Sequence, residues 1–218
     1  LDYVVTKMPR FPFDKFSSAN NKLSTQMKAT GEVMSVGRTI EESLLKAARS
    51  LEIGVNHLYM KKFEAFTDDE MLNYIKDGTD DRIYAIAELL RRKTDIGMIC
   101  NATKIDMLFL EKIKNIVKTE NKLKEHIGDT DTLYNAKKLG FSDEFIGKLW
   151  GMTGEEIYKI REKRGMFPVY KMIDTCASEF ESYIPYFYST YEDENESVVS
   201  DKKKIIVLGS GPIRIGQG

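Results

Sequence analysis

The sequence predicts a mainly α-helical fold that is flanked by α/β segments at its two ends. Apolar residues recur at helical spacing from about residue 40 to residue 165, and short polar stretches separate the predicted helices. Both ends carry continuous apolar runs rich in β-branched residues, at residues 1–5 and 204–208, which are typical of strands. The helical part is therefore expected to lie between two strand-containing segments.

The composition excludes several classes of protein. The chain has 218 residues, and 33 Lys and Arg against 34 Asp and Glu give a net charge of −1. This balance disfavours a free-standing nucleic-acid binder, since such proteins carry a basic excess. No apolar run approaches the ~18 residues of a membrane span, and the start lacks the pattern of a signal peptide. We therefore expect a globular, cytoplasmic protein with no membrane partner.

The cysteines and histidines predict neither a metal site nor a catalytic site. Cys100 and Cys176 are far apart and belong to no CxxC or Cys/His spacing, so a zinc site is not expected. Both are interpreted as free, buried thiols because no secretory signal is present, and a disulfide between them is the alternative. His57 and His126 have no Ser, Cys or acidic partner at a catalytic spacing, and we expect structural or surface roles for them.

Three Thr-x-x-Glu sequences mark helix starts, because the hydroxyl and the carboxylate of such a pair can each cap the backbone near the other residue. They occur at Thr39 with Glu42, at Thr67 with Glu70, and at Thr153 with Glu156, and the helices that follow should end near Gly54, Gly78 and Gly165. Further helices are expected over residues 81–92, 105–122, 132–139 and 143–150, with no strand between residues 67 and 165.

The helix over residues 105–122 is predicted to be amphipathic. Its apolar stripe, expected to pack on the core, consists of Leu108, Phe109, Ile113, Ile116 and Val117. Its opposite face, expected to meet solvent, consists of Glu111, Lys112, Lys114, Asn115 and Lys118.

An aromatic-rich segment follows at residues 166–191 and predicts extended chain lying across an apolar surface. A base-stacking platform is disfavoured, because such platforms have basic grooves and this segment holds Asp174, Glu179 and Glu181. The charged residues 192–204 are typical of an exposed linker.

The last residues predict a strand of a parallel sheet, residues 204–208, that runs into a glycine-rich loop. Gly209 and Gly211 match the opening of a dinucleotide-binding fingerprint, but Arg214 occupies the third glycine position, so independent nucleotide binding is disfavoured. A strand and loop of this kind should lead into a helix, and we expect the chain to be a piece of a longer polypeptide.

Five blocks of sequence, in order, resemble the large subunit of carbamoyl phosphate synthetase. They are residues 1–11, 25–39, 168–180, 188–192 and 207–218. The resemblance implies that residues 1–50 form the C-terminal edge of a first ATP-grasp synthetase half. It implies further that residues 51–200 form a helical oligomerisation domain, and that residues 201–218 begin the pre-ATP-grasp part of a second half.

The resemblance also implies a parent activity. The parent would be a glutamine-hydrolysing ligase that makes carbamoyl phosphate from bicarbonate, glutamine-derived ammonia and two ATP. It would use Mg²⁺ or Mn²⁺ and a glutaminase small subunit, in arginine or pyrimidine biosynthesis. The resemblance places the family's nucleotide-binding and metal-binding elements before Leu1 and after Gly218, so the chain alone is expected to bind no cofactor and to be inactive.

The resemblance places one set of site residues in the C-terminal loop. Arg214, Gly216 and Gly218 would line the internal passage that carries carbamate, where a permanent cation suits an anionic intermediate and glycines leave the passage open. No catalytic role is assigned to Lys28, Glu32 or Arg38, which are interpreted as surface charges.

Two functions remain open at this point. The leading one is a spacer that self-associates through its helices within the ligase. The alternative is a stand-alone helical regulatory or nucleic-acid-binding module that uses residues 130–165, although we isolate no basic face there for phosphate contacts.

Overall fold

The computed structural model describes residues 2–13, 15–16, 18–29, 31–176, 179–180, 186–207 and 209. These residues form eight α-helices, one 3₁₀ helix and two small antiparallel sheets of two strands each. The predicted mainly α fold is confirmed. The assignment of the flanking segments to ATP-grasp halves, and the domain boundaries at residues 50 and 200, stay predictions.

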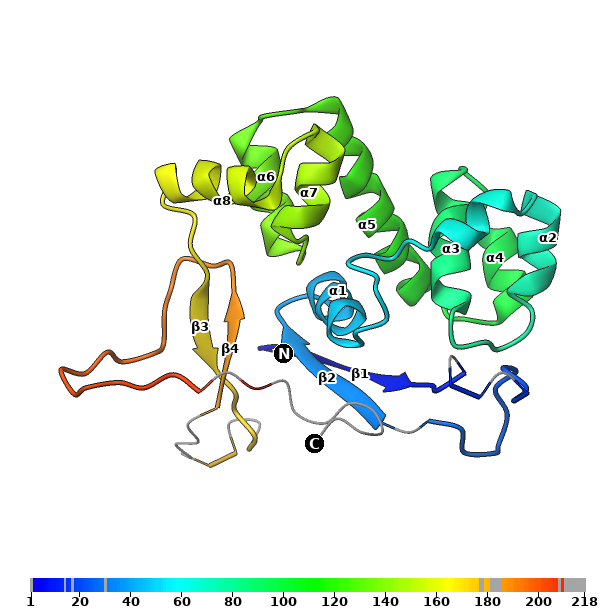
Figure 1. Cartoon of the computed structure of the whole chain (residues 1–218), viewed down its shortest axis with the longest axis horizontal. Helices are drawn as coiled ribbons and strands as arrows, with labels where there is room; N and C mark the ends of the chain where they lie inside the picture. The colour runs from blue at the N-terminus through cyan, green and yellow to red at the C-terminus, as the bar shows by residue number, and fades with distance from the viewer. Residues whose placement is uncertain are drawn as a thin grey trace.

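The N-terminal sheet pairs β1 (Val4–Arg10) with β2 (Gly31–Gly37), in a register that sets Val4 opposite Gly37. Helix α1 (Ile40–Ser50) covers one face of this sheet, where Val33 of β2 packs against Ala47 of α1 and Leu51 just beyond it. Figure 1 shows α1 lying directly above the two strands. The helix therefore joins the sheet to the rest of the protein.

The remaining helices form a larger body with a continuous core. They are η1 (Lys61–Ala65), α2 (Asp68–Tyr74), α3 (Arg82–Arg91), α4 (Ile96–Thr103), α5 (Met107–Glu125), α6 (Thr130–Lys138), α7 (Asp143–Trp150) and α8 (Gly154–Lys163). The long helix α5 contacts α1, α3, α4, α6 and α7, and in Figure 1 it runs between the group α2–α4 and the group α6–α8. It is the central element of the helical body.

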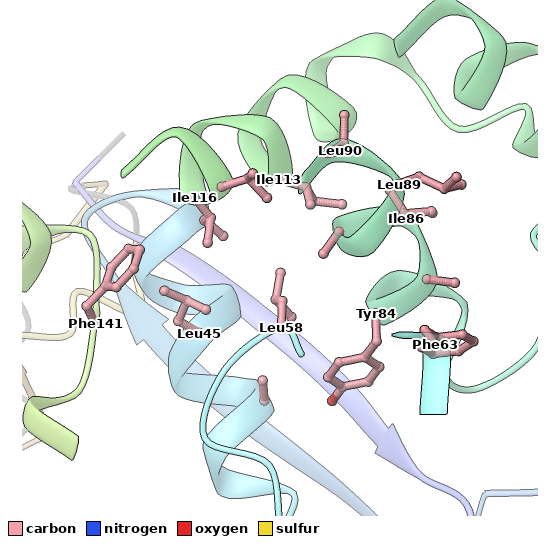
Figure 2. Close-up of a cluster of buried hydrophobic side chains, with 14 of the residues drawn as sticks. Leu45, Leu58, Phe63, Tyr84, Ile86, Leu89, Leu90, Ile113, Ile116 and Phe141 are labelled. Carbon is pink, nitrogen blue, oxygen red and sulfur yellow. The ribbon is translucent and has the colours of Figure 1, made fainter. Parts of the chain in front are cut away.

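The core is built from side chains of helices that are distant in sequence. Figure 2 shows Leu45 of α1, Leu58, Leu89 of α3 and Ile116 of α5 converging on one cluster. All four side chains are fully buried. Because α1 contributes to this cluster as well as to the sheet, one helix links both parts.

The predicted helix starts are largely confirmed. Thr67 and Thr153 each form a complete capping box with the glutamate three residues later. Helix α4 was not predicted: it contains Gly97 and Asn101, which are poor helix formers, and it depends on Asp95, whose side chain accepts from the Met98 amide.

The C-terminal segment forms a hairpin of β3 (Val169–Met172) and β4 (Phe187–Thr190). The prediction of extended chain is correct, but the aromatic rings do not all lie on an apolar surface. Tyr188 is buried, whereas Tyr170, Phe180 and Tyr186 are exposed.

The strand expected over residues 204–208 does not form in the described part of this segment. Residues 204–207 have no strand conformation, and the side chains of Ile205, Ile206 and Val207 are more than four-fifths exposed. A buried strand needs neighbours that pair with its backbone, and the described strands pair only as β1 with β2 and β3 with β4. Residue 208 lies outside the described residues.

Candidate functional site at the junction of the two sheets

The N-terminal sheet and the C-terminal hairpin meet beside the start of α1. Strand β4 contacts β2, and the rings of Tyr3 and Tyr188 lie with their centroids 6.0 Å apart. The Tyr3 hydroxyl donates to the carbonyl oxygen of Asp174 at 2.6 Å. Two segments about 150 residues apart in the sequence are therefore held side by side.

Glu42 is the centre of this junction and is only 1% exposed. Its Oε2 accepts from the Arg38 amide at 2.7 Å and from the Thr190 hydroxyl at 3.0 Å, while its Oε1 lies 2.7 Å from Lys46 Nζ. Buried carboxylates need such partners, because an unpaired buried charge is strongly destabilising. One side chain thus binds the end of β2, the helix α1 and the end of β4.

One further ion pair and two hydrogen bonds to backbone complete what we call the junction cluster, namely Arg38, Glu42, Lys46, Thr190 and Glu192. Arg38 Nε lies 2.6 Å from Glu192 Oε1, and this pair holds the pKa of Arg38 above its ordinary value although partial burial acts the other way. Lys46 Nζ also donates to the carbonyl oxygens of Val36 and Ser189. The cluster joins both strand segments to one turn of α1.

The predicted capping box at the start of α1 is only half formed. The Thr39 hydroxyl accepts from the Glu42 amide at 3.1 Å, as expected. The Glu42 carboxylate, however, accepts from the amide of Arg38 and not from that of Thr39. The physical reason is that this carboxylate also serves Thr190 and Lys46.

The turn between α6 and α7 presses against the same part of α1. Gly140 has a φ of +87°, and a Cβ placed there would lie 2.8 Å from the Cα atom of Glu42. Arg49 Nη1 donates to the Gly140 carbonyl oxygen at 2.7 Å. A side chain at this position would separate the two backbones, so glycine is required for the close approach.

A second group of charges ties the C-terminal segment to α6, α7 and α8. Arg161 donates to both carboxylate oxygens of Asp143, at 2.6 Å from Nη2 and 3.0 Å from Nε, and Lys137 Nζ lies 2.9 Å from the same carboxylate. Both cations lie over the Tyr191 ring. Burial lowers the pKa of Lys137 to about 8 and raises that of Tyr191 to about 12.

A third group lies inside the helical body. His57 Nε2 is 2.8 Å from Glu120 Oε1, and Arg91 donates to both oxygens of Glu120 at 2.8 Å. Burial alone would raise the pKa of Glu120, but these hydrogen bonds outweigh it and lower the pKa to about 2. Burial lowers the pKa of His57, whose ring stacks on Phe145. The arrangement is a buried structural network, as expected for this histidine.

The described residues contain no cluster of metal ligands. Over these residues, no three His, Cys, Asp or Glu side chains gather to hold a metal ion, so they do not fit the Mg²⁺ that the resemblance implies for the parent. Cys100 and Cys176 are free thiols, as predicted. Along the described chain, none of the helices combines the length and the apolar character needed to cross a bilayer.

The predicted carbamate-passage residues cannot be placed, since Arg214, Gly216 and Gly218 lie outside the described residues. Of the charges interpreted as surface groups, Glu32 forms an exposed ion pair with Lys7. The Lys28 ammonium donates to the carbonyl oxygens of Asn20 and Lys22. Arg38 is also exposed, and it additionally pairs with Glu192 in the junction cluster.

The apolar stripe predicted for α5 is wrong at its N-terminal end. Ile113, Ile116 and Val117 are buried as expected, but Leu108 is 55% exposed and Phe109 is 51% exposed, whereas Leu110 is fully buried. The first turn of α5 therefore carries two half-exposed apolar side chains.

Sequence reasoning missed most of the junction. Glu42 was recognised only as a helix-capping residue, and its contact with Thr190 spans 148 positions. Nothing in the local pattern around Asp143 or Arg161 indicates Tyr191 as a common neighbour. The available signal was indirect, since the density of aromatic residues after Gly165 did indicate packing against another element.

Taken together, these features define a mainly helical domain that uses its charged side chains for internal contacts between distant segments. The family model described as the carbamoyl-phosphate synthetase large chain, oligomerisation domain, matches residues 32–165, from β2 to the end of α8. The chain belongs to this family, which confirms the resemblance seen in the sequence.

Proposed function

We propose that this chain is the oligomerisation and spacer segment of a ligase that makes carbamoyl phosphate from bicarbonate, glutamine-derived ammonia and two ATP. The family match supports a place in the large chain of that enzyme. In the parent, ATP with Mg²⁺ or Mn²⁺ would serve the phosphoryl transfers, and a glutaminase small subunit would supply ammonia in the cytoplasm. The segment itself would hold the neighbouring parts of the large chain in position and would take no part in the chemical steps.

The junction cluster is the observation that carries the spacer role. A spacer must hold the segments that enter and leave it in a fixed relation, and here the end of β2 and the end of β4 share the carboxylate of Glu42. Glu42 lies on α1, which also packs in the helical core through Leu45. Movement of either strand segment would therefore disturb the helical body.

Self-association is proposed to use the first turn of α5. Leu108 stands beside a shallow groove whose other lining residues are charged or polar, among them Glu41 and Lys112. An apolar centre with a polar rim is the usual composition of a protein interface, and stable interfaces bury at least about 1,000 Å². A second copy of the chain would cover this turn.

Light scattering after size exclusion tests the association. We expect wild-type protein to self-associate at high micromolar concentration and Leu108→Glu to be monomeric, because a charge would be buried in the interface. Ile127→Glu is the matched control, since Ile127 is similarly exposed but follows the opposite end of α5. A monomeric wild type, or equal association of Leu108→Glu, would contradict the proposal.

We regard a nucleic-acid-binding module of residues 130–165 as the less favoured alternative, since part of the positive charge of this region is used internally. The two buried cations of this region, Lys137 and Arg161, are both paired with Asp143. They are used for internal contacts, so they do not offer charge to phosphates.

A further inference from the structure

A cavity of about 330 Å³ lies between the end of β1, the start of α3 and the first turns of α5. Most of its wall is apolar and is formed by residues such as Met8, Leu51, Ile53, Ile86, Ile105 and Phe109. A volume near 300 Å³ is at the lower end of small-molecule sites. The half-exposed ring of Phe109 means that part of this wall still meets solvent.

One polar group in the wall has no hydrogen-bond partner among the described residues. Tyr84 is 2% exposed, and its hydroxyl is buried without a partner there. Burial, followed by the nearby charges of Asp80 and Asp81, raises its pKa to about 12. Figure 2 shows the Tyr84 hydroxyl directed away from α3 and from the hydrophobic cluster. A buried unpaired hydroxyl is costly, so a polar group in the cavity would stabilise it.

Four charged side chains line the cavity, namely Arg10 at the end of β1 and Asp80, Asp81 and Arg82 where α3 begins. Asp80 is exposed and forms no ion pair with described residues, although the charges of Lys62 and Arg10 act on its carboxylate. Its pKa is raised, first by partial loss of solvent and then by the charge of Asp81. Arg82 makes no side-chain hydrogen bond or ion pair with described residues. Asp81 differs, because Lys62, Tyr74 and Thr79 already bind its carboxylate.

The start of α3 adds a preference for a negative group beside Arg82. The helix has ten residues, and its N-cap residue, Asp81, makes no side-chain capping bond. The positive end of a helix dipole favours a carboxylate. The cavity thus offers a negative group, a positive group and an apolar wall within one site.

We propose that this cavity binds a free α-amino acid with an apolar side chain. Its ammonium group would face Asp80, its carboxylate would face Arg82 and the first turn of α3, and its side chain would pack on Phe109 and the aliphatic wall. The Tyr84 hydroxyl would donate to the carboxylate. This inference is independent of the proposed role in oligomerisation.

Titration of the full chain with L-phenylalanine, followed by NMR of the methyl groups of Ile105 and Ile113, tests the proposal. We expect saturable shifts at these methyls below about 10 mM ligand, a concentration that corresponds to weak binding. Phenethylamine lacks the carboxylate and 3-phenylpropionate lacks the ammonium group, so each should bind at least about tenfold more weakly. Shifts that fail to appear, or equal binding of phenethylamine, would overturn the assignment.

Variants locate the site within the protein. Asp80→Asn and Arg82→Gln should each weaken binding about tenfold, and Tyr84→Phe should weaken it several-fold. The matched controls Asp69→Asn and Arg164→Gln change exposed groups of the same kinds outside the cavity and should leave the affinity unchanged. Equal weakening by the controls would overturn the site. Leu108 does not line this cavity, so Leu108→Glu should bind L-phenylalanine as the wild type does even if it no longer self-associates. The two proposals can therefore fail independently.

Discussion

The contact between the α6–α7 turn and α1 predicts a large difference between two chemically identical substitutions. Gly140 and Gly128 have nearly equal φ values, +87° and +82°. An added Cβ at Gly140 would lie 2.8 Å from the Cα atom and 3.0 Å from the carbonyl oxygen of Glu42, whereas at Gly128 nothing lies within 4 Å. The loss of stability in Gly128→Ala therefore reports only the cost of the left-handed backbone conformation. The loss in Gly140→Ala contains the same cost and, in addition, the cost of the steric clash with the backbone of Glu42.

The magnitude follows from these distances. A left-handed non-glycine residue costs about 1–2 kcal/mol, and the loss of glycine's freedom in the unfolded chain offsets about 0.4–1 kcal/mol. Both terms are shared, so they cancel between Gly140→Ala and Gly128→Ala. Overpacking against backbone atoms adds about 1–3 kcal/mol, because backbone cannot rotate away as a side chain can. Gly140→Ala should be less stable than Gly128→Ala by that amount.

Urea unfolding followed by far-UV circular dichroism measures the difference. The slope of the free energy with urea should be the same for both variants, since the surface exposed on unfolding does not change. Hydrogen exchange supplies a local readout: the amides of β4 should lose protection in Gly140→Ala only, because displacement of Glu42 weakens its bond to Thr190. Stabilities within about 0.5 kcal/mol of each other would refute the reasoning.

Three other predictions concern named contacts. The pKa of Glu120 is lowered from 4.5 in the unfolded chain to about 2 in the folded protein. Its ionised form therefore stabilises the fold above pH 4.5, and this stabilisation should be lost progressively as the pH falls from about 4.5 towards 2. Glu120→Gln should remove this part of the pH dependence of the urea midpoint. Trp150→Phe should lower the free energy of unfolding by about 1–3 kcal/mol, because the buried carbonyl of Leu123 loses its 2.8 Å hydrogen bond from the indole Nε1. Tyr158→Phe, at an exposed ring, is the control and should lower it by less than about 0.5 kcal/mol in the same urea assay. Thr153→Ala should cost about 1 kcal/mol through loss of the cap of α8, and Thr153→Ser should restore most of it, as urea unfolding would show.

The starts and ends of most helices can be predicted from the sequence, because they depend on residues that are close together in it. The capping boxes of α2 and α8 each depend on a Thr and a Glu three positions apart, and both form as predicted. Helix α7 begins and ends at the predicted residues, since Ser142 caps it and Gly151 adopts the left-handed conformation that stops it. Helix α4 escapes this reasoning, because tertiary packing of Ile99 compensates for its weak helix formers.

The contacts of the C-terminal segment are not readable in this way, because their partners are not local in the sequence. Glu42 and Thr190 are 148 positions apart, and Arg161 and Tyr191 lie on a helix and beyond a hairpin, respectively. A single sequence contains no spacing that encodes such pairs. The sequence could suggest that residues 166–191 pack somewhere, but it could not say on which element.

The first turn of α5 shows why helical periodicity over-predicts burial, and where that error is informative. Phe109 lies four residues before Ile113, so the two fall on one stripe, yet only Ile113 is covered. Periodicity states which residues share a face, while burial also needs an element opposite that face. An apolar side chain left in water forfeits about 25 cal/mol per Å² of its surface, so a partner or a ligand that covers this turn would be stabilised by that burial. The two proposals use different sides of this turn, since Leu108 borders the groove with Glu41 and Phe109 lines the cavity with Tyr84. Substitutions at Asp80 and at Leu108 should therefore act separately, the first on ligand binding and the second on self-association.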